Sequence, residues 1–258
     1  MTTRPRKPNS TRQMAILHKI LFVLFFPLLT VGVSAACWLT AGIGKNASVA
    51  HWCQCQWARL GLWISGVRIT VDTSRLDPST PYVFLANHQS QFDIPLILAA
   101  LGKHWNVRFV AKESLFRIPL FGAAMVRTGH IAILRENSRK AMKSIDDAVA
   151  AAERGISVLI FPEGTRSDTA EHLGDFKIGG MIMALKCHRP VAPVIMTGSY
   201  EVLPRGSWIP NPGVVHIEAL APFDPSERYT LKQREDFRLW LKEHMETAYQ
   251  ERRSCRTT

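Results

Sequence analysis

The sequence predicts an α/β fold in which a mixed, largely parallel sheet is flanked by helices and preceded by an N-terminal membrane-associated helical segment. Near the N-terminus, Ile20–Gly44 is a run of 25 residues without a charge. From Val67 onward, short β-branched runs alternate with stretches of helical periodicity, which is typical of strands and helices layered around a parallel sheet. The length of 258 residues and the hydrophobic fraction of 47% suit one such domain with a small appendage, and they exclude a disordered or fibrous chain.

The N-terminal segment is basic before it becomes apolar. Residues 1–50 hold six lysines and arginines and no acidic residue, and the whole chain has a net charge of +11. A helix over Ile20–Gly44, at ~1.5 Å per residue, is longer than the ~30 Å hydrocarbon core of a bilayer. The basic flank from Arg4 to Lys19 predicts a cytoplasmic N-terminus that is attracted to an anionic membrane surface.

Two alternatives concern how this segment meets the membrane. Ser34-Ala35-Ala36 resembles a signal-peptide cleavage site and Cys37 suggests a lipoprotein, but the apolar run continues past Cys37, which favours a retained anchor. The stretch Trp52–Ile69 fits either an interfacial amphipathic helix or an ordinary packed helix. If Trp52–Ile69 is interfacial, residues 1–66 form a basic N-terminus with a membrane-associated helical hairpin, and in either case residues 67–258 form the α/β domain.

The α/β domain is expected to alternate strands with helices. Its clearest helix follows Ser138, which can cap the start, and ends at Gly155. The expected strands are Val67–Val71, Tyr82–Ala86, Val107–Ala111, Ile131–Leu134, Val158–Phe161, Val191–Met196 and Val214–Ala219. The expected helices are Ile94–Leu101, Pro119–Thr128, Arg139–Arg154, Gly179–Cys187 and Leu231–Gln250.

The five cysteines, an odd number, fit no disulfide framework in a chain of this length and indicate a reducing, cytosolic compartment. His51, Cys53 and Cys55 form the only local cluster with metal-ligand chemistry. A zinc site needs about four ligands, and no second pair at ligand spacing follows. We therefore expect no metal site.

Polar residues follow the expected strand Tyr82–Ala86, in the sequence Asn87-His88-Gln89-Ser90-Gln91-Phe92-Asp93. In a continuous helix His88 and Asp93 would point roughly 140° apart, so their pairing requires a strand-to-helix turn between them. A carboxylate that orients an imidazole and stabilises the imidazolium makes the histidine a general base for a hydroxyl. The alternative is that Asn87 and Asp93 are helix caps and His88 is an ordinary loop residue.

Further candidate residues follow other strands. Pro162-Glu163-Gly164-Thr165-Arg166-Ser167 follows Val158–Phe161, and its glycine-containing turn and arginine suit a phosphate group, although Glu163 and Arg166 could simply form an ion pair. Lys112 and Arg135 follow two more strands. Because ligands bind beyond the carboxyl ends of parallel strands, these cations predict a pocket for an anionic substrate.

Together these stretches resemble the glycerolipid acyltransferase family, and most closely the 1-acylglycerol-3-phosphate acyltransferases. The match covers roughly Tyr82 to Thr197, and any one of its blocks is a weak signal, whereas all of them in order are highly specific. Relatives often carry an Asp immediately before the arginine of the second block, where this sequence has Leu134. The four blocks are Asn87–Asp93, Gly129–Arg135, Phe161–Ser167 and Val191–Val194.

The resemblance implies a reaction without a covalent acyl-enzyme. His88 would remove the proton from the free hydroxyl of lysophosphatidic acid, and Asp93 would orient His88. The oxygen would attack the thioester of acyl-CoA or acyl-carrier protein, a co-substrate rather than a cofactor, and give phosphatidic acid. Arg166 and Lys112 would bind the acceptor phosphate with support from Arg135.

The resemblance also assigns Glu163, Gly164 and Thr165 to the acceptor site. Because acyl-CoA is cytosolic, it implies a location on the inner or cytoplasmic membrane, with the active site facing the cytosol. A hairpin that dips into one leaflet fits that orientation better than a single span does.

Other functions remain as alternatives. A serine hydrolase with Ser90 or Ser199 as its nucleophile is one alternative, but the sequence contains no G-x-S-x-G elbow, which makes it unfavoured. Related enzymes act on other lyso-lipids, such as lyso-ornithine lipid, and a non-catalytic membrane-binding protein is the alternative from another class. Nucleic acid is not an expected partner, because the basic residues cluster beside the apolar segment without interleaved stacking aromatics. Gly42–Ala47 fits G-x-G-x-x-A but follows no strand, so dinucleotide binding is poorly supported.

Overall fold

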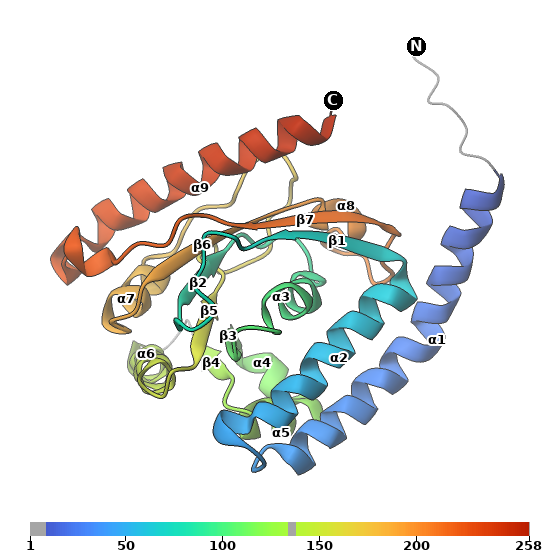
Figure 1. Ribbon diagram of the computed structural model, residues 1–258, viewed down its shortest axis with the longest axis horizontal. Coiled ribbons are helices and arrows are strands. Elements are labelled where there is room, and N and C mark those ends of the chain that lie inside the picture. The colour runs from blue at the N-terminus through green and yellow to red at the C-terminus, as the bar shows by residue number, and fades with distance from the viewer. Residues whose placement is uncertain (1–8, 134–137, 258) are drawn as a thin grey trace.

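A seven-stranded sheet forms the centre of the computed structural model, which describes residues 9–133 and 138–257 (Figure 1). The strand order is β1-β7-β6-β2-β5-β3-β4. Neighbours from β6 to β4 run parallel, β7 is antiparallel to β6, and β1 is parallel to β7, which confirms the mixed, largely parallel sheet. The strands are β1 Val67–Asp72, β2 Val83–Ala86, β3 Val107–Lys112, β4 Ile131–Ile133, β5 Ser157–Ile160, β6 Val191–Thr197 and β7 Gly213–Ala219.

Helices cover both faces of the sheet (Figure 1). Along β2, Val83 and Leu85 pack toward α6, α7 and α9, whereas Phe84 and Ala86 pack toward α1, α2 and α3. This alternation in a fully buried strand is what a sheet with helices on both sides requires. The helices are α1 Asn9–Thr40, α2 Ser48–Ser65, α3 Asp93–Leu101, α4 Glu113–Phe116, α5 Phe121–Arg127, α6 Ser138–Glu153, α7 Ile178–Lys186, α8 Ser199–Val202 and α9 Arg234–Thr257. Short 3₁₀ turns lie at Lys45–Ala47, Pro225–Glu227 and Leu231–Gln233.

The α1–α2 hairpin, residues 9–65, packs against α3 (Figure 1). Helix α1 ends at Thr40, four residues before the end of the uncharged run, and Gly44 in the connection has a φ of 77°. The turn of the hairpin is held to the sheet, because the carbonyl of Asn46 accepts hydrogen bonds from Arg108 Nη2 (2.6 Å) and Asn106 Nδ2 (2.9 Å). At the other end, His18 Nδ1 bonds the carbonyl of Ile64 (2.9 Å).

Helix α2 is packed on one side and exposes apolar residues on the other. Ala50, Ala58 and Leu62 are buried, whereas Trp52 and Trp63 are exposed. Helix α1 is long and apolar enough to cross a bilayer over Arg12–Thr40, and only 17% of its most apolar window is buried. The apolar helix thus indicates membrane association, and α2 is both a packed helix and part of an exposed apolar surface.

Several helices differ from the sequence prediction. The helix expected over Pro119–Thr128 begins only at α5, because Leu120 has a φ of 62° and the N–H of Phe121 closes a tight turn onto the carbonyl of Pro119 (2.7 Å). The short helix α4 precedes it and was not expected. Helix α9 begins three residues after Leu231 and continues to Thr257, past the predicted end at Gln250.

Candidate active site at the carboxyl edge of the sheet

The candidate residues lie at one edge of the sheet, here called the carboxyl edge, where β2, β3, β5 and β6 end. The β2 turn comprises residues 87–93, and the β5 turn comprises residues 161–167. Because β2 and β5 are adjacent and parallel, their turns are neighbours. Lys112 is the exposed last residue of β3, the next strand along. Arg135 lies outside the described residues.

His88 and Asp93 meet in the β2 turn. The distance between His88 Nδ1 and Asp93 Oδ2 is 2.8 Å, so the pairing expected across a strand-to-helix turn is confirmed. Asp93 is fully buried, and the same oxygen accepts the N–H groups of Gln89 (2.8 Å) and Ser90 (2.9 Å). An acceptor of this kind keeps the proton of the neutral imidazole on Nδ1, and Nε2 keeps its lone pair.

The ring of His88 is fixed from a second direction. It stacks on Phe161, the first residue of the β5 turn, with 4.0 Å between ring centroids and an interplanar angle of 16°. The side chain of His88 retains 18% of its exposure, so the imidazole is accessible at the surface of the turn. The carboxylate and the aromatic ring together hold one ring orientation.

Other polar residues of the β2 turn serve its structure. The side-chain amide of Asn87 bonds both the N–H (2.7 Å) and the carbonyl (2.9 Å) of Met196 in β6. The Ser90 hydroxyl donates to the carbonyl of Leu203 (2.9 Å) and accepts the N–H of Phe92 (3.0 Å). Ser90 and Ser199 are both fully buried, which disfavours either hydroxyl as a nucleophile.

Glu163 joins three segments beneath the site. Its Oε1 accepts the backbone N–H of His88 (2.7 Å), and its Oε2 accepts the N–H of Gly174 (2.8 Å). A Cβ atom at Gly174 would lie 2.5 Å from Oε2, which explains why glycine stands there. Glu163 is only 2% exposed, and burial raises its pKa to about 7 although the two N–H groups oppose that shift.

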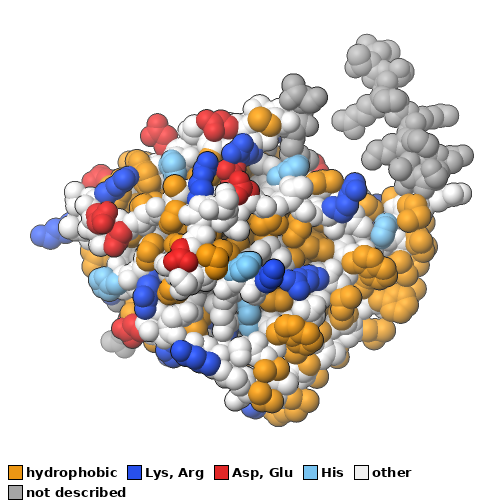
Figure 2. Space-filling model, in the orientation of Figure 1, with side chains coloured by type: hydrophobic (Ala, Val, Ile, Leu, Met, Phe, Trp, Pro, Cys, Tyr) orange, Lys and Arg blue, Asp and Glu red, His pale blue; other side chains and the backbone are white. Residues whose placement is uncertain are grey.

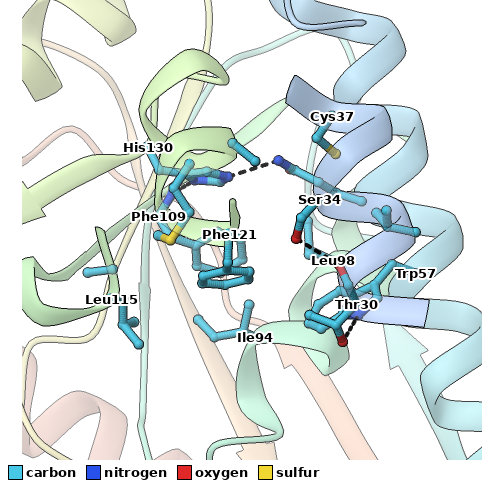
Figure 3. Close-up of a pocket in the computed structure, with 15 residues that line it drawn as sticks. Thr30, Ser34, Cys37, Trp57, Ile94, Leu98, Phe109, Leu115, Phe121 and His130 are labelled. Carbon is cyan, nitrogen blue, oxygen red and sulfur yellow. Dashed lines mark hydrogen bonds between the residues drawn. The ribbon is translucent and has the colours of Figure 1, made fainter. Parts of the chain in front are cut away.

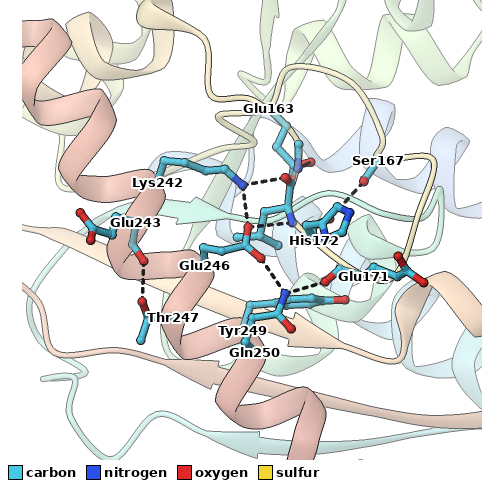
Figure 4. A network of polar contacts seen from close by, with 12 residues as sticks. Glu163, Ser167, Glu171, His172, Lys242, Glu243, Glu246, Thr247, Tyr249 and Gln250 are labelled. Atoms are coloured by element: carbon cyan, nitrogen blue, oxygen red, sulfur yellow. Dashed lines mark hydrogen bonds and ion pairs between the residues drawn. The ribbon is translucent and has the colours of Figure 1, made fainter.

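A polar network from α9 supports the loop that contains Gly174 (Figure 4). Lys242 Nζ lies 2.6 Å from both the carbonyl of Leu173 and Oε2 of Glu246, and the same carboxylate oxygen accepts the N–H of Leu173 (3.0 Å). The positive charge of Lys242 also opposes the rise in the pKa of Glu163 that burial causes. The C-terminal helix therefore helps to place the carboxylate that binds the backbone of His88.

The β5 turn binds the backbone of His88 on its other side and presents Arg166. Gly164 has a φ of 71°, the left-handed conformation that glycine adopts without strain. The N–H of Ser167 donates to the carbonyl of His88 (2.8 Å), so Arg166 lies directly beside the β2 turn. Thr165 is exposed. Nη1 of Arg166 is buried and has no hydrogen-bond partner among the residues the structure describes. A buried guanidinium nitrogen without a partner can receive an anion.

An apolar cavity of about 100 Å³ lies between the α1–α2 hairpin and the segments that follow β3 (Figure 3). Its lining includes the chain neighbours of two candidate residues, because Ile94 follows Asp93 and Ala111 precedes Lys112. No sequence signal identified this cavity, since its lining comes from separate elements that are not periodic with one another. Among its apolar lining residues are Val33, Ile94, Leu98, Phe109, Leu115 and Phe121.

The cysteine cluster has structural partners. His51 Nε2 lies 3.0 Å from the carbonyl of Gly102 and 3.6 Å from Cys55 Sγ. Within residues 9–133 and 138–257, no group of three or more His, Cys, Asp or Glu side chains could hold a metal ion. All five cysteines are free thiols.

Comparisons with known proteins agree with this arrangement. A sequence model of the family described as "Acyltransferase" matches residues 68–197. The chain is 33% identical over 165 residues to a protein of Cocos nucifera named 1-acyl-sn-glycerol-3-phosphate acyltransferase, a match that covers 64% of this chain and 52% of that protein. A protein of the same name from Pseudomonas aeruginosa is 30% identical over 166 residues, with 62% of this chain and 63% of the relative covered.

The match extends to a solved fold. The crystal structure of the 1-acyl-sn-glycerophosphate (LPA) acyltransferase PlsC from Thermotoga maritima superposes with a TM-score of 0.77 at 23% identity, covering 94% of this chain and 97% of that one. At this identity the likeness concerns the fold. The chain spans 39–52% of the length of three plant relatives that it matches, including that of Cocos nucifera.

Proposed function

The chain belongs to the acyltransferase family, and we propose that it transfers a fatty acyl group from acyl-CoA or acyl-carrier protein to the free hydroxyl of 1-acylglycerol 3-phosphate, forming phosphatidic acid. One arrangement carries the proposal. A buried carboxylate holds Nδ1 of His88, and the adjoining turn contains a buried nitrogen of Arg166 without a partner among the described residues. A general base beside an anion site suits a phosphorylated alcohol as acceptor. The names of the matched relatives support the choice of acceptor.

In the proposed reaction, His88 and Asp93 move the proton. Nε2 of His88 takes the proton of the acceptor hydroxyl while the oxygen forms a bond to the thioester carbonyl carbon. Asp93, on Nδ1, stabilises the imidazolium that forms. The carbon–sulfur bond then breaks, and the leaving thiolate takes the proton from the imidazolium. The products are an ester and a free thiol, no acyl-enzyme forms, and the only co-substrate is the acyl donor.

The acceptor phosphate is proposed to bind Arg166 and Lys112, with Arg135 as a further cation. Arg166 has the strongest structural support, because its partnerless nitrogen lies in the turn that bonds the carbonyl of His88. Lys112 ends the strand next to β5 at the same edge. Gly164 and Thr165 would shape this pocket from the exposed side of the turn. Glu163 would shape it from below by holding the backbone, since both of its oxygens already accept N–H groups.

An acyl chain is the occupant we propose for the apolar cavity of Figure 3. The cavity lies beside Ile94 and Ala111, so a chain in it would place its carbonyl end near the carboxyl edge. Transfer of each methylene from water to such a site is worth ~0.8 kcal/mol.

The acceptor and product are lipids, so we propose that the protein works at the cytosolic face of the cytoplasmic membrane, with the α1–α2 hairpin in one leaflet. Figure 2 shows hydrophobic side chains gathered over this hairpin, and charged side chains lie mostly elsewhere on that face. Exposed apolar residues on α1 include Leu17, Ile20, Leu24, Phe25, Leu28 and Val31. The hairpin would thus contact lipid, the basic N-terminal residues would contact anionic headgroups, and nucleic acid would have no part in the function.

One assay tests the proposal. The purified full-length chain is incubated with lysophosphatidic acid, lyso-ornithine lipid and glycerol 3-phosphate, each with acyl-CoA and with acyl-carrier protein, and the ester products are quantified. We expect phosphatidic acid from lysophosphatidic acid. Acylation of lyso-ornithine lipid alone would transfer the proposal to that acceptor. No product from any pair would leave a non-catalytic membrane-binding protein as the remaining function.

A further inference from the structure

The segment between α8 and β7, residues 203–212, exposes a tryptophan and an isoleucine at the carboxyl edge. Trp208 is 80% exposed, the highest value among the large hydrophobic residues of the described chain, and Ile209 is 41% exposed. Scattered exposed apolar residues are normal on a soluble surface and need no explanation. Trp208 and Ile209 differ from such residues because they lie at the carboxyl edge of the sheet.

The 203–212 segment lies at the end of the fold where α2 leads into β1 (Figure 1). It leads into Gly213, which pairs with Val67 in the register of β7 and β1, and Val67 comes two residues after the end of α2. The last turn of α2 contains Trp63, which is 73% exposed. The hydrogen bond from His18 to the carbonyl of Ile64 places the N-terminal half of α1 at the same end. The exposed residues of the segment therefore lie at the same end of the fold as Trp63 and the N-terminal half of α1.

The segment is also fixed with respect to the β5 turn. Arg205 Nη1 lies 2.7 Å from Asp168 Oδ1, and the hydroxyl of Tyr200 donates to the carbonyl of Asp168 (3.0 Å). Asp168 follows Ser167, whose N–H binds the carbonyl of His88. On its other side, the N–H of Asn211 donates to the carbonyl of Val202 (2.7 Å). The ion pair of Arg205 with Asp168 and the hydrogen bond of Ser167 with His88 thus link the segment to the turn that contains His88.

We propose that the 203–212 segment is a second membrane contact, separate from the hairpin, in which Trp208 and Ile209 enter the headgroup region of the bilayer and hold the carboxyl edge at the lipid surface. Tryptophan is favoured at that level because its ring is apolar and its N–H is polar. The segment carries no acidic residue and its one cation, Arg205, is paired with Asp168, so its contact with lipid would rest on the apolar side chains, and the basic residues 1–50 supply the attraction to an anionic bilayer. This inference rests on the proposed lipid acceptor.

Point substitutions test the contact better than truncation does. Phe22 and Cys37 of α1 belong to the core, so removal of the N-terminal residues would damage the fold. The full-length Trp208→Ala protein is compared with wild type for partitioning onto vesicles of phosphatidylglycerol and phosphatidylethanolamine. Leu239→Ser is the matched control, because Leu239 is an exposed apolar residue on α9. We expect Trp208→Ala to weaken partitioning about tenfold, the effect of withdrawing one large apolar side chain from lipid, and Leu239→Ser to leave it unchanged.

Depth and activity provide two further readouts. Brominated lipids should quench a component of the tryptophan emission that Trp208→Phe lacks. In the acylation assay, Trp208→Ala should lower the rate on long-chain acceptors in vesicles about tenfold and leave the rate on a short-chain, water-soluble acceptor unchanged.

Several outcomes would overturn the inference. One is wild-type partitioning of Trp208→Ala together with no quenching difference in Trp208→Phe. Another is an equal loss on both acceptors, which would mean that Trp208 acts on the active site through Asp168 and not on the membrane. If the wild-type chain acylates no acceptor, the proposed function fails, whereas the partitioning and quenching results still decide whether the contact exists.

Discussion

The β2 turn and the β5 turn each supply a carboxylate to His88, but the two carboxylates bind different parts of it. Asp93 binds the imidazole nitrogen and two N–H groups of its own turn. Glu163 binds the backbone N–H of His88 and the N–H of Gly174, so it connects separate loops. The ring and the main chain of one residue are thus positioned independently. The chemistry proposed for His88 and its placement can therefore be disturbed one at a time.

Removal of the imidazole should have the largest effect. His88→Ala should lower kcat by ~10²–10⁴-fold or more, because it removes the group proposed as the general base. The melting temperature should change little, since the side chain is partly exposed and its backbone bonds remain. Activity close to that of wild type would show that the general base lies elsewhere.

Loss of the charge on Asp93 should come next. Asp93→Asn leaves the shape of the turn but offers an amide to Nδ1, so the imidazolium is no longer stabilised and the tautomer is no longer fixed. We expect kcat to fall roughly 10²-fold with little change in the KM for either substrate. Because the residue is fully buried and accepts two N–H groups, circular dichroism melting should accompany the kinetics. A raised KM with normal kcat would contradict an orienting role.

Substitution of Arg166, the proposed phosphate ligand in the β5 turn, should mainly weaken binding of the acceptor. Arg166→Ala should raise the KM for lysophosphatidic acid roughly 10- to 100-fold, as expected when one charge-assisted contact is lost, and the KM for the acyl donor should hardly change. Arg166→Lys should recover part of the loss, because a lysine restores the charge without the planar fork. A selective effect on the donor would instead assign Arg166 to the thioester side.

The smallest effect on turnover is expected at Glu163, where pH is the informative variable. The pKa of Glu163 is raised from 4.5 to about 7 by burial, so the folded chain keeps a proton that the unfolded chain has lost in this interval. Wild type should therefore lose stability relative to Glu163→Gln as pH rises from about 4.5 to about 7, by on the order of 1–3 kcal/mol. Above that interval the difference should stay constant.

Urea unfolding of both proteins at several pH values measures this difference. Activity at pH 8 should fall only several-fold in Glu163→Gln, because the amide carbonyl can still accept the N–H of His88. A kcat loss as large as that of His88→Ala would mean that Glu163 takes part in the proton transfer itself. In that case the separation between the two carboxylates would not hold.

Local features of the structure could be predicted from the sequence, whereas contacts between distant segments could not. Strand starts and ends were predicted to within a residue or two because β-branched runs are bounded by turn residues. The pairing of His88 with Asp93 followed from their position after a strand. The role of Glu163 could not be predicted, because its partner Gly174 lies in a loop without periodicity. The tight turn at Leu120 could not be predicted either, since leucine rarely adopts a positive φ.

The hydrogen bonds on both sides of His88 have a consequence for the time course of binding. The N–H and the carbonyl of this residue are both occupied before any ligand arrives, as they would be inside a strand. No loop needs to fold around the acceptor for the base to be in place, so association needs little ordering of this part of the chain. The amide protons of His88 and Ser167 should accordingly exchange with solvent as slowly as those of β2, and they should slow no further when the acceptor binds.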